Sequence, residues 1–355
     1  MNNFVKALKK AVSIIPRNVS HPILGATLLK GNGEDLNIFA IGNDISVKIT
    51  IDCDFKLDCC VNGKLLCDFL QSIKGNVKLE QTEQSLMVYS DNNELELPII
   101  SSQEFPSFPE LMGSKISVLA SDLKNAFKKV DFVPTRDWYE PFKASVLFDY
   151  QYELLKIVAS DDRRLAICSI IANEEETIEH KKVLLSRDTI LGLENILFDQ
   201  GEISIQFGDN LVSFSCNDIE ENIVVFANLV GGEFPNYERV IPKEEFGCCD
   251  CEIWRENLIQ SLKRASLVTN LISINISDTF NLSGFGEQGK FKEIVPVLEA
   301  YGSINIMCNL KYLLQPLSRI EDEKVKLKFM GEKSPIVLES KNYIYVVMPV
   351  EAIEE

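Results

Sequence analysis

The stretch Leu8-Lys9-Lys10-Ala11 returns twice in this chain, as Phe127-Lys128-Lys129-Val130 and as Leu262-Lys263-Arg264-Ala265. Each copy lies in a segment whose apolar residues recur with helical spacing, and the basic pair falls on the other face. A second helical segment follows each copy, and each begins with one basic residue and has an isoleucine nine positions later: Lys64 to Ile73, Arg187 to Ile196 and Lys311 to Ile320. The repeated unit therefore contains two helices.

The period of this repeat, near 120 residues, is that of a domain and exceeds the roughly 20 to 50 residues of a solenoid repeat. A chain of 355 residues is long enough for three such domains, each with its own core. Two proline-containing stretches, Glu104 to Pro109 and Phe234 to Pro242, follow predicted strands and are linker candidates. We predict three similar domains, at residues 1–114, 115–243 and 244–355.

Short apolar or alternating runs, separated by Gly, Asn and Asp, surround the predicted helices and are typical of antiparallel strands. In the first unit such runs are Leu24 to Leu29, Leu36 to Ile41, Ile45 to Ile51 and Phe55 to Val61. The fold class is therefore α+β, with two helices packed on antiparallel sheets in each domain. We expect Ser121 and Ser186 to be helix N-caps, and Pro316 to kink the last helix.

The charge of the chain is segregated by predicted element. The whole chain carries a net charge of -17, which by itself argues against a nucleic-acid partner. The helical windows nevertheless carry +7 and the remainder -24; these windows are residues 3–15, 61–73, 121–133, 185–197, 253–267 and 308–320. Lysines on solvated helix faces would explain one such window. Three matched copies instead suggest helices that line one curved basic surface.

A curved basic surface suits a phosphate backbone, and lysines without a pattern able to read base edges predict sequence-independent binding to double-stranded DNA. An acidic exterior does not prevent this, because a helix layer of about 10 to 12 Å exceeds the screening length of about 8 Å at physiological salt. The candidate DNA-binding residues in the helical windows are Lys6, Lys9, Lys10, Lys64, Lys128, Lys129, Arg187, Lys263, Arg264 and Lys311.

Ten cysteines are scattered along the chain, mostly in apolar runs that resemble strands, which predicts buried, reduced thiols. The cluster Cys248-Cys249-Asp250-Cys251 has no second matching cluster, and His21 and His180 are the only histidines. We therefore expect no metal and no cofactor. No apolar run is long enough for a membrane span and the N-terminus lacks a signal-peptide pattern, so a cytoplasmic protein without a membrane partner is expected.

Four stretches, taken together, carry a resemblance that runs the length of the chain: Ser20 to Leu24, Ala159 to Ala166, Phe234 to Pro242 and Tyr345 to Pro349. The chain resembles the bacterial DNA polymerase III beta subunit family, the sliding clamps. The resemblance implies three clamp domains in each subunit and a head-to-tail homodimer that closes a ring around duplex DNA. It also implies a clamp loader that opens the ring, and docking of the polymerase catalytic subunit and other proteins with a clamp-binding motif. The clamp itself would be a processivity factor and not an enzyme.

The resemblance also assigns residues. It implies a partner-peptide pocket between the second and third domains, formed by Ser160, Arg164, Leu165, Pro235, Arg239, Val240, Val346, Val347, Met348 and Pro349. A DNA-contacting arginine of the family falls at Asn18, so Arg17 is the substitute candidate. The implied dimer interface sets Phe105 and Phe108 against Leu267 and Val268.

The chain departs from the family pattern near the pocket. Asp162-Arg163 stands where the family usually has Gly-His, and Lys143 stands at a usual pocket leucine. The tail from Val350 to Glu355 is longer and acidic. These departures predict a different affinity or peptide preference.

Two other functions fit parts of the sequence. Asp161, Asp162 and Asp149 could hold magnesium in a nuclease, although adjacent strand residues point to opposite faces. A repeat-built scaffold that binds proteins without DNA is the second alternative. No phosphate-binding glycine loop or nucleophile elbow is present.

Overall fold

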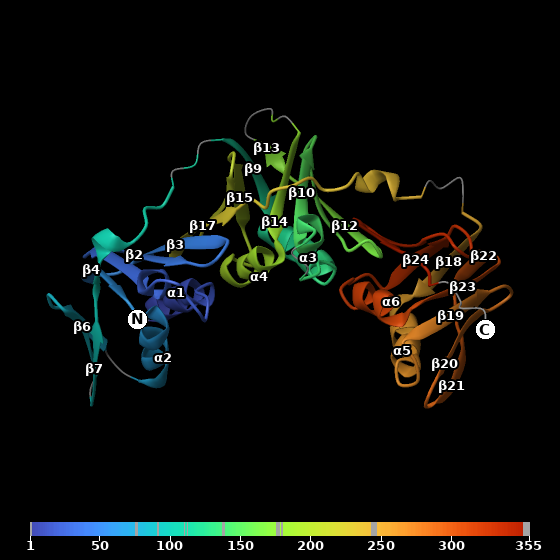
Figure 1. The fold of residues 1–355 in the computed structure, drawn as a ribbon, viewed down its shortest axis with the longest axis horizontal. Coiled ribbons are helices and arrows are strands. Elements are labelled where there is room, and N and C mark those ends of the chain that lie inside the picture. Colours follow the sequence, from blue (N-terminus) through green and yellow to red (C-terminus); the bar gives the residue numbers. More distant parts are fainter. Residues whose placement is uncertain are drawn as a thin grey trace.

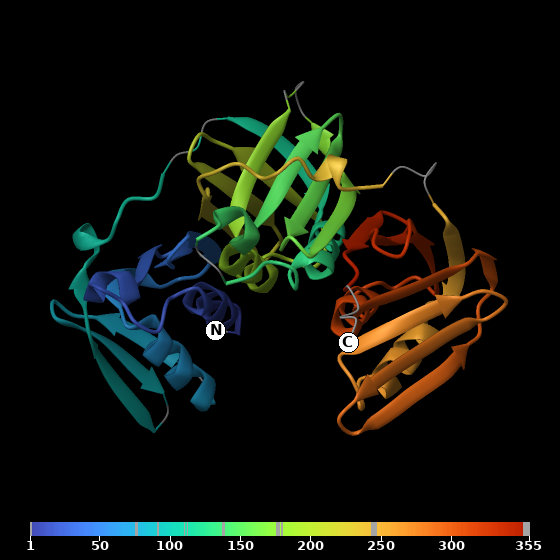
Figure 2. The same ribbon diagram turned by 45° about the vertical axis from the view of Figure 1, so that its right-hand side comes forward.

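The computed structural model describes residues 2–74, 77–90, 92–109, 111, 113–136, 139–174, 178, 180–242 and 247–350. The chain forms an arch of three similar units, with helices on the concave side and sheets on the convex side (Figure 1). The view in Figure 2 shows the same arch from another angle, with its two ends apart. The predicted boundary at residue 114 falls on the first residue of a strand, and the one at 243/244 lies outside the described residues.

All six predicted helices are confirmed: α1 (Asn2–Ser13), α2 (Gly63–Ser72), α3 (Ala120–Val130), α4 (Arg187–Ile196), α5 (Arg255–Ala265) and α6 (Leu310–Leu317). Ser186 caps α4 as predicted, because its hydroxyl accepts a hydrogen bond from the amide of Thr189 at 3.1 Å. The N-cap prediction for Ser121 is wrong, since α3 begins one residue earlier and follows Leu119. Pro316 lies one residue before the end of α6, so its missing hydrogen bond falls in the last turn.

The strands of the first unit are β1 (Thr27–Asn32), β2 (Asp35–Ile41), β3 (Ile45–Asp52), β4 (Lys56–Val61), β5 (Val77–Gln81), β6 (Ser85–Ser90), β7 (Asn93–Pro98) and β8 (Ile100–Ser101). The strand predicted from Leu24 begins later, because Pro22–Gly25 forms a 3₁₀ turn. Proline lacks the amide hydrogen that a strand ladder needs and suits the first turn of a helix.

The second unit contains β9 (Ser114–Leu119), β10 (Ser145–Gln151), β11 (Leu154–Ser160), β12 (Arg164–Ile171), β13 (Asn173–Glu174), β14 (Lys181–Ser186), β15 (Glu202–Phe207), β16 (Leu211–Asn217) and β17 (Glu221–Asn228). The third contains β18 (Cys249–Trp254), β19 (Leu271–Ile276), β20 (Phe280–Gly286), β21 (Gly289–Val295), β22 (Glu299–Gly302), β23 (Ile304–Asn309), β24 (Lys324–Phe329), β25 (Ile336–Ser340) and β26 (Tyr343–Val347). The strand pairs within each unit are antiparallel, as predicted.

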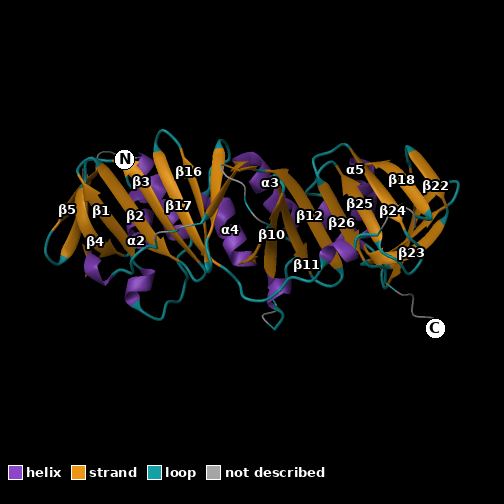
Figure 3. Cartoon of the chain, turned by 90° about the horizontal axis from the view of Figure 1, so that it is seen from above, coloured by secondary structure: helices purple, strands orange, loops and turns teal. Residues whose placement is uncertain are grey.

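Two sheets continue from one unit into the next. β3 of the first unit pairs with β17 of the second, and β12 of the second pairs with β26 of the third. This gives a ten-stranded sheet and a nine-stranded sheet, beside a four-stranded sheet and a three-stranded sheet at the two ends. Seen from above, the strands follow one another along the whole arch (Figure 3). Backbone hydrogen bonds thus join the units and fix their relative positions.

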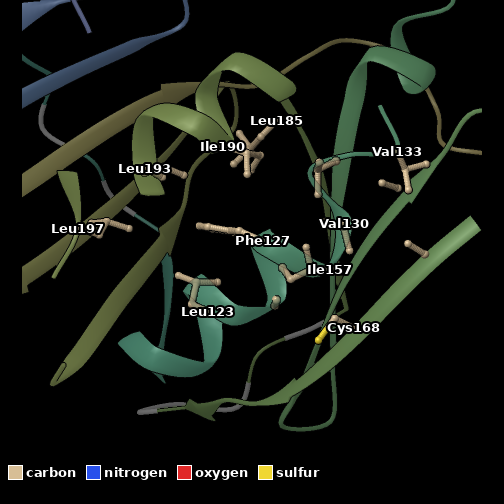
Figure 4. Close-up of a cluster of buried hydrophobic side chains, with 14 of the residues drawn as sticks. Leu123, Phe127, Val130, Val133, Ile157, Cys168, Leu185, Ile190, Leu193 and Leu197 are labelled. Atoms are coloured by element: carbon tan, nitrogen blue, oxygen red, sulfur yellow. The ribbon is translucent and has the colours of Figure 1, made fainter. Parts of the chain in front are cut away.

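The helices pack their apolar faces onto the sheets and onto each other. In the second unit Phe127 points from α3 into the space beside Ile190 and Leu193 of α4 (Figure 4). Phe127 is fully buried, and its ring centroid lies 5.9 Å from that of Phe148 on β10. Burying such side chains contributes roughly 1.5 to 3 kcal/mol each. Each helix therefore packs its apolar face on the sheets, and its polar face is directed toward the concave side.

All ten cysteines are free, and eight of them are buried. This confirms the prediction of unpaired thiols within the core. Burial raises the pKa of the Cys251 thiol to about 12, with smaller effects of Cys249 and Glu252. The buried thiols therefore stay protonated and unreactive at neutral pH. None of the helices in the described part of the chain has both the length and the apolar composition that crossing a bilayer demands.

Candidate nucleic-acid interface and peptide pocket

The two residues of each basic pair have different environments. The first residue of every pair, Lys9, Lys128 or Lys263, is exposed, and none of the three forms an ion pair with the described residues. The second residue has a partner within the chain. Lys10 forms an ion pair with Glu221, and its ammonium lies 4.5 Å from the ring centroid of Phe198.

In the second and third units the second residue is also held by the protein. Lys129 is buried, and its ammonium donates to the Asn342 side-chain oxygen at 3.1 Å. Arg264 donates through Nε to Glu293 at 3.0 Å. Successive helix residues point about 100° apart, so the second residue of the pair turns toward the neighbouring sheet. Lys10, Lys129 and Arg264 therefore have partners within the single chain, and their role in DNA binding stays a prediction.

The other predicted DNA-binding residues divide in the same way. Lys6, Arg17 and Lys311 are exposed. Lys64 is half-buried and donates to the backbone oxygen of Ile15 at 2.9 Å. Arg187 is half-buried and donates to the backbone oxygen of Asp131 at 3.3 Å. Seven of the eleven predicted residues are thus exposed: Lys6, Lys9, Arg17, Lys128, Lys263, Arg264 and Lys311. Of these seven, Arg264 forms an ion pair with Glu293.

A pocket of about 220 Å³ lies on the outer side of the junction between the second and third units. Seven of the ten predicted residues line it: Ser160, Arg164, Leu165, Pro235, Val240, Val346 and Met348. The prediction is wrong for Val347, which is buried in the main core because neighbouring strand residues face opposite sides. Pro349 lines an adjacent groove instead, and Arg239 is exposed on the linker outside the lining.

Arg164 lines the pocket as predicted, but its charge is held by partners within the chain. Its Nε donates to Asp161 at 2.9 Å, and its Nη1 donates to Gln315 of α6 at 2.5 Å. The guanidinium also stacks on Tyr312, with 4.3 Å between the guanidinium carbon and the ring centroid. Only 8% of Arg164 is exposed. Its charge therefore joins the second unit to the third and is unavailable to a peptide.

Five lining residues were not predicted as pocket residues: Phe142, Asp162, Arg163, Phe234 and Tyr237. Phe142 supplies an apolar wall beside Lys143, the position at which the family usually has a leucine. Lys143 turns aside and forms ion pairs with Glu140 and Asp162. The signal that could have identified Phe142 is the aromatic residue beside the lysine, since only one of two neighbours can face a pocket.

Tyr237 is fixed in the pocket wall by a buried carboxylate. The Tyr237 hydroxyl donates to Asp149 Oδ2 at 2.7 Å, while His180 lies 2.5 Å from Asp149 Oδ1. Lys182 lies 3.2 Å from the same carboxylate. Burial alone would raise the pKa of Asp149, but hydrogen bonds from His180, Tyr237 and Lys182 outweigh it and lower the pKa. The linker between the second and third units is therefore tied to β10.

The residues predicted for the dimer interface are not equivalent. Phe105 is buried within its own chain, and Phe108 packs between Phe39 and Phe226 with centroid distances of 4.9 and 5.8 Å. The linker thus folds back on its own sheet and leaves Phe108 half-buried, and contact of these two rings with a partner stays a prediction. Leu267 remains 75% exposed and Val268 is half-buried.

The three carboxylates considered for a nuclease have separate partners. Asp161 binds Arg164, Asp162 binds Lys143, and Asp149 accepts from Tyr237. Across the described ranges, no three His, Cys, Asp or Glu side chains are grouped as metal ligands. The three carboxylates therefore do not form a shared magnesium site of the kind that the nuclease alternative requires.

Comparison with known proteins gives a consistent result along the chain. Residues 1–109, 117–236 and 238–351 match the N-terminal, central and C-terminal domain models of the DNA polymerase III beta subunit. The chain is 26% identical to the beta sliding clamp of Pseudomonas aeruginosa, over 97% of this chain and 96% of that protein. It is 25% identical to the beta sliding clamp of Staphylococcus aureus, over 95% and 93%.

Solved structures show the same fold. A DNA polymerase III subunit beta from Pseudomonas aeruginosa, bound to griselimycin, matches with a TM-score of 0.91 at 23% identity, over 99% of this chain and 98% of that one. The DNA polymerase sliding clamp of Bacillus subtilis matches with a TM-score of 0.90 at 18% identity and the same coverage.

Proposed function

Because the chain belongs to the DNA polymerase III beta subunit family, we propose that its exposed basic residues line a ring around duplex DNA. The function of the family applies to the chain: it is a DNA sliding clamp, a non-catalytic factor that gives a DNA polymerase its processivity.

The observation that supports DNA contact is an exposed lysine that recurs on the helices of all three units. Lys9, Lys128 and Lys263 occupy the same position in three units, and the helices that carry them lie on the concave side (Figure 1). Lys6 adds exposed charge to α1, Arg17 to the loop after α1, and Lys311 to α6. Contacts of this kind bind phosphates without reading bases. The clamp can therefore slide.

The test compares the two members of each pair. The triple variant Lys9→Glu, Lys128→Glu and Lys263→Glu should lower retention on nicked circular DNA after loading, and its loss should be larger at low salt. The matched control replaces Lys10, Lys129 and Arg264 by glutamine, which should reduce stability and leave DNA retention closer to that of the wild type. Equal retention by the wild type and the glutamate triple would refute the assigned lining.

The route to a closed ring follows from the two junctions inside the chain. One sheet of each unit has the same strand order: β4-β1-β2-β3 in the first, β14-β10-β11-β12 in the second and β23-β19-β20-β21 in the third. The strand at the end of this order pairs with a strand of the next unit, β3 with β17 and β12 with β26. The corresponding strand of the third unit is β21, which is an edge strand. In the first unit the strand that corresponds to β17 and β26 is β7, which is the edge of the three-stranded sheet. A second copy would pair β7 with β21.

The charges on the two edges are complementary. Lys290 and Lys292 are exposed on β21, and Glu94 and Glu96 are exposed on β7. In the two internal junctions Val47 lies opposite Val225, and Ala166 lies opposite Tyr345. If Phe291 and Leu95 take these positions, antiparallel pairing sets Lys290 against Glu96 and Lys292 against Glu94. Opposite charges across strands stabilise a pair by roughly 0.2 to 1 kcal/mol.

Leu267 supports the same arrangement. It lies three residues after Arg264, as Phe132 lies three residues after Lys129. Phe132 contacts Tyr345 of the next unit, with ring centroids 6.1 Å apart. Leu267 would contact the corresponding strand of a second copy, and its 75% exposed side chain would then be buried. The proposed assembly is a head-to-tail homodimer.

Charge exchange tests this interface. The variant Glu94→Lys with Glu96→Lys should shift the dimer toward monomer in sedimentation, because lysines would face Lys290 and Lys292. Adding Lys290→Glu and Lys292→Glu to the same chain should restore the dimer. A quadruple variant that remains monomeric, or a double variant that dimerises like the wild type, would exclude the proposed register.

The pocket between the second and third units is proposed to bind short linear segments of replication proteins. Its apolar wall of Phe142, Leu165 and Val346 suits a leucine or aromatic anchor. The polymerase catalytic subunit and the clamp loader are the partners that the family implies. Binding of a labelled ten-residue peptide with such anchors, and its loss in Leu165→Glu, tests this part independently of DNA.

A further inference from the structure

The run Asp161-Asp162-Arg163-Arg164 at the pocket contains four charges, three of which have partners. Asp161 binds Arg164, and Asp162 binds Lys143. Arg163 is exposed, and its guanidinium makes no ion pair or hydrogen bond with the described part of the chain. Arg163 is therefore the charge at this site that is free for a ligand.

The position of Arg163 is central to a longer binding surface. Arg163 lines the apolar pocket of about 220 Å³ and also an adjacent groove of about 1020 Å³. Asp162 and Met348 are shared by the two cavities as well. The groove continues over Ser273 and Asn305 of the third unit. A peptide anchored in the pocket would pass Arg163 as it enters the groove.

We propose that Arg163 selects partner peptides with an acidic residue next to the apolar anchor. The inference rests on the proposed peptide-binding function of the pocket and names the chemistry of its partner. A guanidinium binds a carboxylate through two parallel hydrogen bonds, which a neutral amide cannot match in charge. Arg163 is thus a specificity-determining residue, whereas Arg164 is a structural one.

The carboxylate of Asp162 does not cancel this preference, because it is directed away. Asp162 has a φ of +66°, a left-handed conformation that aspartate tolerates better than most residues. Its side chain reaches Lys143, which also binds Glu140. These two hydrogen bonds raise the pKa of Lys143 to about 12, so the lysine keeps its charge at neutral pH. Lys143 thereby keeps Asp162 from competing for Arg163.

The test uses two labelled ten-residue peptides with the same apolar anchors, one with aspartate and the other with asparagine beside the anchor. Fluorescence anisotropy on the full chain should give about fivefold tighter binding of the aspartate peptide at low salt, as expected for a partly exposed ion pair. Arg163→Gln should reduce this ratio to about one, as one expects when the charge is removed. The matched control Arg239→Gln changes an exposed arginine outside the pocket lining and should leave the ratio unchanged.

A second variant tests whether Lys143 keeps Asp162 away from Arg163. Lys143→Gln releases Asp162, which should then compete for Arg163 and lower the ratio about twofold or threefold. If both peptides bind the wild type equally, or if Arg163→Gln keeps the preference, the selectivity proposal is overturned while the pocket function stands. If neither peptide binds, the pocket function fails and the selectivity proposal fails with it.

Discussion

The two junctions inside the chain have the same strand pairing and a different outer surface. At the first, the linker residues Phe105 and Phe108 pack on the sheet, with ring centroids 6.4 Å apart. At the second, Phe234 and Tyr237 take the same spacing, with centroids 6.3 Å apart. The linkers are thus equivalent, yet the second junction has a pocket where the first is covered.

The difference follows from two side chains. Phe108 lies over the first junction, 5.8 Å from Phe226 between centroids. In the second junction the smaller Val346 stands at the position of Phe226, and Tyr237 is held away by its hydrogen bond to Asp149. A repeated fold therefore leaves a pocket where one side chain is smaller and one ring is held back by a hydrogen bond. Five variants would test this difference between the junctions.

The largest effect is expected from making the second junction resemble the first. Val346→Phe should fill the pocket and weaken binding of the anchored peptide at least about thirtyfold, because a central anchor contributes roughly 2 to 4 kcal/mol. Peptide anisotropy measures this effect. Retention on circular DNA should remain as in the wild type, which controls for folding. Unchanged peptide affinity would mean that the pocket is not the binding site.

Opening the first junction should affect stability and not peptide binding. Phe108→Ala removes a ring that contacts Phe39, Phe105 and Phe226. The free energy of unfolding should fall by about 2 kcal/mol, less than the roughly 3 to 5 kcal/mol for a fully buried phenylalanine, because Phe108 is only half-buried. Denaturant titration measures it. A loss of peptide affinity comparable to that of Val346→Phe would contradict the separation of the two junctions.

Releasing the second linker should have a smaller effect that depends on pH. The pKa of Asp149 is lowered in the folded chain, so its carboxylate stabilises the fold above the unfolded pKa near 3.8. This stabilisation is lost as the pH falls through the folded pKa. Asp149→Asn should cost about 1.5 kcal/mol at pH 7 and flatten the decline below about pH 4. Denaturation at pH 3 to 7 tests this, and parallel curves for the two proteins would refute it.

The smallest effects are expected at the inner face of the junctions. Lys10 pairs with the Glu221 carboxylate across the first, whereas Lys129 is buried with the neutral side chain of Asn342 across the second. Lys10→Met should cost about 1 kcal/mol because it leaves a carboxylate unpaired, and Lys129→Met should cost about zero. Thermal unfolding of both variants gives the comparison. A larger loss for Lys129→Met would reverse this interpretation.

The helices were predictable because the signal is local. Apolar residues at helical spacing, together with repetition, located all six within a few residues, since burial of one face determines where a helix lies. The sequence also pointed to most of the pocket, through its resemblance to a known family. Val347 was the exception within β26, because strand alternation turns it inward between Val346 and Met348.

The use of each charged side chain was not predictable in the same way. Lys9 and Lys10 are neighbours of the same type, and Arg163 and Arg164 are another such pair. Their different surroundings depend on Glu221 and Gln315, which lie more than a hundred positions away in the sequence. No periodicity along the chain records such long-range partners.

The amino-acid sequence by itself determined that the chain has three α+β units with basic helices, because composition and spacing act within each segment. Tertiary structure alone decided which member of each basic pair has a partner within the chain, which junction has a pocket, and that β7 and β21 lie at sheet edges. These properties depend on side chains brought together from separate units, where a few ångströms determine whether a charge is paired or free.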